Sequence, residues 1–154
     1  MEKILLIMST SGYEPEAVEY ALQTAEKESA QLISCYIIDA EIPEAVSSWL
    51  IYVGFMGDEP SEDYRNVVLQ EYKQRAQETL DEVGKLAETR NIKVYSFILE
   101  GSLLEQAIKI TKESEADLIV IKKPQQIDFG RFLHGSIIDD LKKRVPCPVK
   151  VVGN

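Results

Sequence analysis

The chain has 154 residues, about the size of one domain, so we treat residues 1–154 as a single domain. Hydrophobic residues make up 45% of the chain and charged residues 28%, a globular balance that argues against disorder. The formal net charge is -9, which disfavours binding to nucleic acid or to an anionic membrane surface, because both need a basic patch.

Residues that commonly hold metals or form disulfides are scarce. Cys35, His134 and Cys147 lack the spacing of zinc ligands, so no metal site is expected. Two distant cysteines make no disulfide framework, which favours reduced thiols in a cytoplasmic protein. The longest apolar run, Trp49–Met56, is far shorter than the roughly 20 residues that cross a membrane. We therefore expect no membrane span.

Short apolar runs alternate with helical patterns along the chain. The apolar runs predict strands over residues 4–8, 32–38, 92–99, 118–121 and 149–152. The helical patterns predict helices that begin near Pro15, cover residues 61–90, begin after a capping box of Ser102 and Glu105, and run from about Ser136 to Arg144. This alternation predicts an α/β fold with an open, doubly wound, five-stranded parallel sheet and helices on both faces.

Ligands of such folds bind outside the carboxyl ends of the strands, where the strand order reverses. The segments that follow the predicted strands are residues 9–12, Asp39, Glu100-Gly101 and residues 122–135. We expect any ligand site to be built from these segments.

The whole chain resembles the universal stress protein family. Shorter matches are Lys3-Ile4-Leu5-Leu6, Glu19-Tyr20-Ala21-Leu22, Glu100-Gly101-Ser102 and the predicted strand with its preceding residues, 116–121. The most telling match is Gly135-Ser136 followed by Pro146-Cys147-Pro148-Val149. The resemblance implies a regulatory protein, and it implies a homodimer that pairs through the last strand, at Val149, Val151 and Val152.

One branch of that family binds ATP through a loop of the form Gly-x2-Gly-x9-Gly-Ser/Thr. Counting back from Gly135 places Lys122 and Gln125 where the first two glycines should stand. Such glycines let backbone amides approach a phosphate closely, and Pro124 between them has no N–H to donate. The resemblance thus implies a nucleotide site that is degenerate in this chain.

The candidate nucleotide or anion site consists of Ser9, in place of the family's acidic residue, with Ile38, Lys122, Gly135, Ser136 and Ile137. A helix beginning at Gly135-Ser136 would offer free amides to an anion, and Lys122 and Lys123 would add charge. The alternatives are a plain turn with a helix cap and a solvated lysine loop. No cofactor is expected, and ATP or AMP is kept as a possible ligand.

Three functions follow from these observations. The first is a homodimeric, non-enzymatic interaction protein with a degenerate nucleotide site, and the second is an ATP- or AMP-binding member of the same family. The third is a flavodoxin-like FMN redox protein, suggested by Ser9-Thr10-Ser11-Gly12, although Glu14 would repel the phosphate. No nucleophile is paired with His134, so catalysis has little support.

An aromatic segment, Trp49–Met56, stands in the long connection before the second predicted helix. Trp49, Tyr52 and Phe55 are spaced by three residues and would share one face of a helix. Contiguous exposed apolar surface usually marks an interaction site, so these residues are candidate interface residues for a protein partner of unknown identity. Internal packing and a lid over the cleft are the alternatives.

Overall fold

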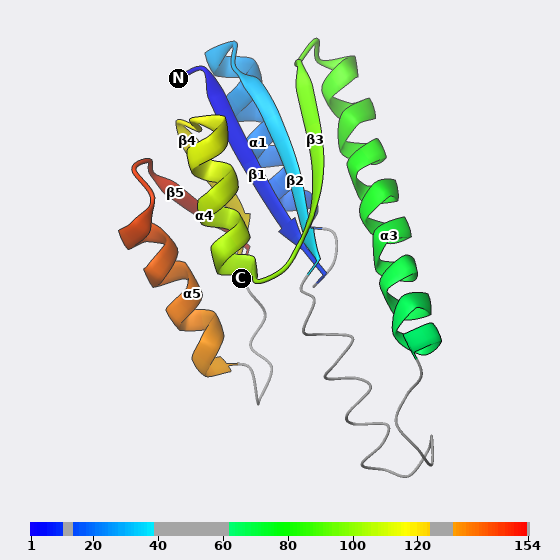
Figure 1. The fold of residues 1–154 in the computed structure, drawn as a ribbon. Helices are drawn as coiled ribbons and strands as arrows, with labels where there is room; N and C mark the ends of the chain where they lie inside the picture. Colours follow the sequence, from blue (N-terminus) through cyan, green and yellow to red (C-terminus); the bar gives the residue numbers. More distant parts are fainter. Residues whose placement is uncertain (11–13, 39–61, 124–130, 154) are drawn as a thin grey trace.

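A computed structural model describes residues 1–10, 14–38, 62–123 and 131–153 of the chain. The strands are β1 (Lys3–Ser9), β2 (Gln31–Ile38), β3 (Val94–Glu100), β4 (Leu118–Lys122) and β5 (Val149–Val152). The helices are α1 (Pro15–Glu28), α3 (Glu62–Thr89), α4 (Leu103–Ser114) and α5 (Arg131–Arg144). This order confirms the predicted α/β alternation (Figure 1).

The five strands form one parallel sheet in the order β3-β2-β1-β4-β5. The chain first moves outward from β1 through β2 to β3, and then crosses back so that β4 lies on the other side of β1. The strand order therefore reverses between β1 and β4, and any switch-point site lies at the carboxyl ends of these two strands.

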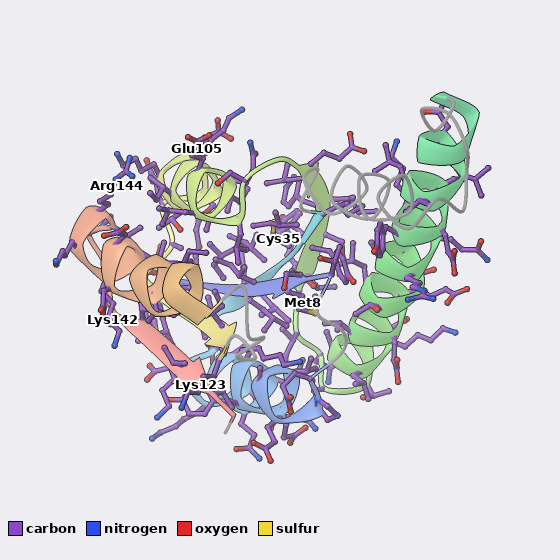
Figure 2. The ribbon with its side chains drawn as sticks, turned by 90° about the horizontal axis from the view of Figure 1, so that it is seen from below. Met8, Cys35, Glu105, Lys123, Lys142 and Arg144 are labelled. Atoms are coloured by element: carbon purple, nitrogen blue, oxygen red, sulfur yellow. The ribbon has the colours of Figure 1, made fainter. Side chains whose placement is uncertain are left out.

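In the central strands β1, β2 and β4, apolar side chains alternate between the two faces of the sheet, and both faces are covered. In β1, Ile4 and Leu6 pack with helices α1 and α3, whereas Leu5 and Ile7 pack with α4 and α5. The two helix layers lie on opposite sides of the sheet in Figure 2. Burial on both faces explains why the strands are nearly unbroken apolar runs.

The predicted starts of α1 and α4 are confirmed. Pro15 occupies the first turn of α1, and the Glu14 side chain caps it by accepting a hydrogen bond from the Glu16 backbone N–H. Ser102 caps α4, because its hydroxyl accepts the Glu105 N–H at 3.5 Å. Both helices end on a residue in the left-handed conformation, which satisfies the last carbonyls without a glycine.

The predicted start of α5 is wrong. The helix begins at Arg131 rather than near Ser136, so Gly135 and Ser136 lie inside it. Leu133, Ile137 and Leu141 are spaced by four residues, which continues a helical apolar pattern upstream through Gly135. A single glycine inside a helix costs only about 1 kcal/mol, so it does not stop the helix.

Asp117 ties the amino-terminal residues to the start of β4. Its carboxylate accepts the backbone N–H groups of Glu2 and Lys3, with N···O distances of 2.7 and 2.9 Å. These two hydrogen bonds, together with the nearby α-amino group and Lys3, lower the pKa of Asp117 below its ordinary value of 3.8. The ionised carboxylate is therefore the form that the folded chain favours.

This arrangement predicts a specific acid dependence of stability. Because the pKa is lower in the folded chain, the Asp117 contribution is fully present above pH 3.8 and is lost as the pH falls through the folded value. Asp117→Asn should remove this dependence and lower the free energy of unfolding at pH 7 by about 1 kcal/mol or less, since the side chain is exposed. Urea unfolding at pH 7 and pH 3 measures both effects. An unchanged pH dependence in the variant would contradict the assignment.

Candidate functional site

The switch point brings together three of the candidate residues that are distant in sequence. Ser9 ends β1 and pairs with Ile37, the neighbour of Ile38 at the end of β2. Lys122 ends β4 on the other side of β1. The carboxyl ends of three strands thus meet at one edge of the sheet, as the sequence predicted.

The side chains of these residues do not share one face. Alternation directs Ile38 and Lys122 to the face covered by α1 and α3, in line with Leu118 and Val120 of β4. Ser9 continues the series of Leu5 and Ile7 on the α4 and α5 face. Ser9 and Lys122 are therefore close along the sheet edge but point to opposite layers.

Lys122 is engaged by a carboxylate at the start of α1. Its Nζ lies 3.9 Å from Oε2 of Glu14, and the two side chains are only 14% and 24% exposed. The same Glu14 caps α1, so its charge stands where the amides at a helix start would attract an anion. The Glu14 carboxylate thus places a negative charge at the start of α1, next to Lys122.

Glu14 is not among the site residues predicted from the sequence, where it stands only as an obstacle to FMN. Its place directly before Pro15 marks it as a residue at the start of a helix. Contact with Lys122 depends on the packing of α1 against β4, which places residues 108 positions apart side by side.

The longer α5 changes the predicted anion cradle. In a helix that begins at Arg131, the free N–H groups belong to the first turn, residues 131–134. The backbone N–H of Gly135 and those that follow are directed to carbonyls one turn earlier. The roles proposed for Gly135, Ser136 and Ile137 at an anion site remain predictions, now for residues within the helix.

Several predicted features lie outside the described residues. These are Ser11 and Gly12, the aromatic residues Trp49, Tyr52 and Phe55, and the loop residues Pro124 and Gln125. Within the described part of the chain, no group of three or more His, Cys, Asp or Glu side chains is placed to hold a metal ion. No helix among those residues has the length and apolar character needed to cross a membrane.

Comparison with known proteins places this architecture in a family. The class of protein is an α/β protein with an open, five-stranded parallel sheet. The family model described as "Universal stress protein family" matches residues 1–153, and the chain belongs to that family. This confirms the resemblance seen in the sequence.

Individual relatives agree with this assignment. A universal stress protein of Methanocaldococcus jannaschii is 27% identical over 98% of this chain and 81% of its own length. A structure from the family in Burkholderia pseudomallei has a TM-score of 0.71, at 19% identity over 99% of this chain and 96% of that one. A universal stress protein of Archaeoglobus fulgidus in complex with dAMP has a TM-score of 0.61, at 14% identity over 99% and 98% of the two chains. At these identities the two structures establish the fold alone.

The two cysteines differ in accessibility, and this predicts their reactivity. Cys35 is fully buried in β2, and burial raises its thiol pKa to about 12. Cys147 is half-buried, and burial raises its pKa as well. Because the thiolate is the reactive form, iodoacetamide at pH 8 should modify Cys147 slowly and leave Cys35 unmodified until the chain unfolds. Mass spectrometry of tryptic peptides measures both. Rapid modification of Cys35 in folded protein would contradict its placement.

Proposed function

We propose that this protein is a homodimeric regulatory protein of the cytoplasm that acts by binding a protein partner, without catalysis, and whose nucleotide site is degenerate. The observation that carries the proposal is the Glu14–Lys122 ion pair at the switch point. A nucleotide phosphate arriving there meets the Glu14 carboxylate and a lysine already engaged by it. Lys122 and Gln125 stand in place of two loop glycines, which further disfavours close approach of a phosphate to the backbone.

The second candidate function is an AMP- or ATP-binding universal stress protein. It is favoured by the dAMP complex of the Archaeoglobus fulgidus protein, whose fold this chain shares. The two candidates differ in affinity, so a binding measurement separates them.

We expect wild-type protein to bind ATP and AMP weakly. Each charge-assisted hydrogen bond is worth about 1.5–3 kcal/mol, so the loss of two weakens binding by two or more decades. Isothermal titration calorimetry at low salt should therefore show no binding in the low micromolar range. A low micromolar dissociation constant for either nucleotide would favour the second candidate. Glu14→Gln, which removes the competing negative charge at the start of α1, should tighten binding several-fold.

The matched control for this measurement is Glu16→Gln. Glu16 lies in the same first turn of α1, is exposed and carries the same charge, but is not part of the ion pair with Lys122. If the effect of Glu14 arises from its position, Glu16→Gln leaves the affinity close to that of wild type. Equal gains in the two variants would indicate a general effect of net charge and would remove the basis for the Glu14 role.

The dimer proposal rests on β5, which is an edge strand. Ile119 N–H donates to the Pro148 carbonyl, and Lys123 N–H donates to the Val152 carbonyl, so alternate residues of β5 face β4. The backbone groups of Val149 and Val151 therefore face away from the sheet. An edge of this kind is a template for pairing with a second chain.

Val151→Pro tests this edge. The substitution removes the outward N–H of Val151 and keeps an apolar side chain against the α4 and α5 layer, while the hydrogen bonds to β4 come from its neighbours. Wild-type protein should sediment as a dimer at tens of micromolar, and the variant should shift toward monomer in analytical ultracentrifugation. Circular dichroism checks that the variant is folded. A monomeric wild-type protein, or a folded variant that stays fully dimeric, would contradict pairing through β5.

A further inference from the structure

The opposite edge of the sheet, β3, is unusually open. Three consecutive residues of this strand, Tyr95, Ser96 and Phe97, are all exposed. Tyr95 and Phe97 are 41% and 42% exposed, and they are the exposed aromatic residues among the described side chains. Aromatic rings of this size are usually covered in a folded chain, so this edge has features of an interaction surface.

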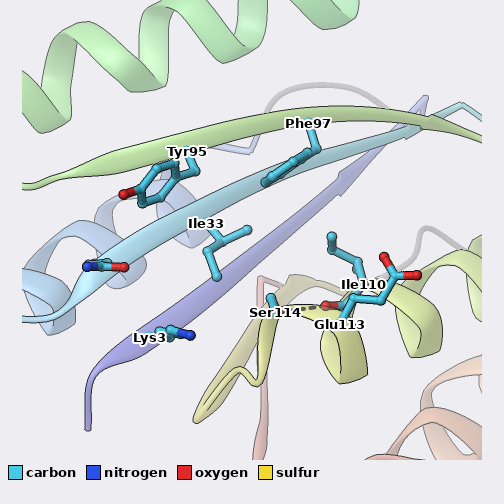
Figure 3. A pocket seen from close by; sticks show the side chains of 8 residues that line it. Lys3, Ile33, Tyr95, Phe97, Ile110, Glu113 and Ser114 are labelled. Carbon is cyan, nitrogen blue, oxygen red and sulfur yellow. Dashed lines mark hydrogen bonds between the residues drawn. The ribbon is translucent and has the colours of Figure 1, made fainter.

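The two rings border a groove of about 380 Å³ on the α4 side of the sheet. Figure 3 shows Tyr95 and Phe97 along β3, Ile33 between them and the helix, and Ile110, Glu113 and Ser114 on α4 across the groove. Helix α4 packs mainly on β1 and β2. Within the described part of the chain, the α4 face of β3 is left bare at Tyr95 and Phe97, although Leu99 on the same face packs into the α4 and α5 core. Helix α3 packs against the other face of β3.

The hydrogen-bond pattern shows which backbone groups of β3 are unpaired within the sheet. Leu32 N–H donates to the Lys93 carbonyl, and Gly101 N–H donates to the Ile38 carbonyl. Odd-numbered residues of β3 thus direct their backbone groups to β2, and even-numbered residues direct theirs away from the sheet. Val94, Ser96 and Ile98 present these outward N–H and C=O groups.

We propose that β3 is a second self-association surface, at which it pairs antiparallel with β3 of a second copy about a twofold axis at Ser96. In this register Ser96 exchanges its two backbone hydrogen bonds with the partner's Ser96. Val94 pairs in the same way with the partner's Ile98. Tyr95 then lies directly opposite the partner's Phe97 on the bare face, in the closer type of pair that favours contact between rings.

The register follows from matching side chains across the twofold axis. Because both copies must present the same face, only registers that pair odd with odd and even with even residues are allowed. A register centred on Tyr95 places Val94 opposite Ser96, and one centred on Phe97 places Val94 opposite Glu100. The register centred on Ser96 pairs the aromatic residues with each other and the aliphatic residues Val94 and Ile98 with each other.

The sequence of β3 supports pairing and does not oppose it. Edge strands that avoid pairing carry inward charges, prolines or bulges. Residues 94–99 contain no charged residue and no proline, and they pair with β2 in continuous register. Lys93 directly precedes the strand, and its Nζ lies 5.4 Å from the centroid of the Tyr95 ring in the same chain. This contact keeps the lysine charge near the start of β3. A second copy of the same strand matches this edge, because aromatic residues then face aromatic residues and Val94 faces the partner's Ile98.

Disulfide trapping tests the proposed register. In an antiparallel pair, residues that exchange hydrogen bonds have Cα atoms about 5.5 Å apart, which suits a disulfide. In a Cys147→Ser background, where the fully buried Cys35 is the remaining native thiol, Ser96→Cys should form a cross-linked dimer at tens of micromolar with oxidised glutathione. The product runs at twice the chain mass of 17.4 kDa on a non-reducing gel.

Glu100→Cys is the matched control. Glu100 is exposed and ends the same strand, but the twofold axis at Ser96 puts its two copies more than about 20 Å apart. The proposal expects a strong dimer band for Ser96→Cys, none above background for Glu100→Cys, and loss of the band when Tyr95→Ser and Phe97→Ser are added. Equal cross-linking of the two cysteines, or none at Ser96→Cys in folded protein, overturns it. If β3 pairs with a strand of another protein and not with itself, Ser96→Cys gives no cross-linked dimer in folded protein.

This experiment is independent of the proposed function. Denaturing gels report only the covalent link across β3, whereas sedimentation of Val151→Pro reports pairing through β5. The β3 proposal can therefore fail while the β5 dimer stands, and the reverse also holds.

Discussion

The need to bury both faces of one parallel sheet governs the rest of this structure. A parallel strand in the middle of a sheet exposes apolar side chains on two sides, and helices must cover each side. Here α1 and α3 cover one face, and α4 and α5 cover the other. The crossovers that bring these helices into place also create the reversal of strand order between β1 and β4. The position of the candidate site therefore follows from the same crossovers that cover the sheet with helices.

This constraint explains which parts of the fold were predictable from the sequence. The runs around Ile4–Met8 and Leu118–Ile121 are unbroken apolar segments because both faces are buried, and their assignment as strands is confirmed. The helix start at Ser102 is also a local pattern, and the hydrogen bond from the Glu105 N–H to the Ser102 hydroxyl confirms Ser102 as the cap of α4. The start of α5 was missed because Gly135-Ser136 has the composition of a turn, while the helical spacing that crosses it is weaker.

The features of the site that were missed depend on tertiary packing. An apolar run predicts a strand, but it does not show whether each face of that strand is covered. The sequence therefore predicts strands at both β1 and β3, although Tyr95 and Phe97 of β3 are exposed. Likewise, Glu14 and Lys122 meet only because α1 packs beside β4. Sequence spacing placed the carboxyl ends of the strands to within one residue, although β3 begins at Val94 and not at Ile92. It held no information about which charged side chains at those ends face each other.

The alternation of side chains along β1, β2 and β4 divides the interior into two compartments with the sheet backbone between them. Leu5 and Leu6 are neighbours in sequence, yet each belongs to a different compartment. Substitutions on opposite sides of the sheet share no packing partners, and such substitutions usually act additively. One half of the interior can therefore change its side chains over evolutionary time without a compensating change in the other half. The chain therefore has two hydrophobic cores, one on each face of the sheet, whose side chains can change independently while both remain attached to the same sheet backbone.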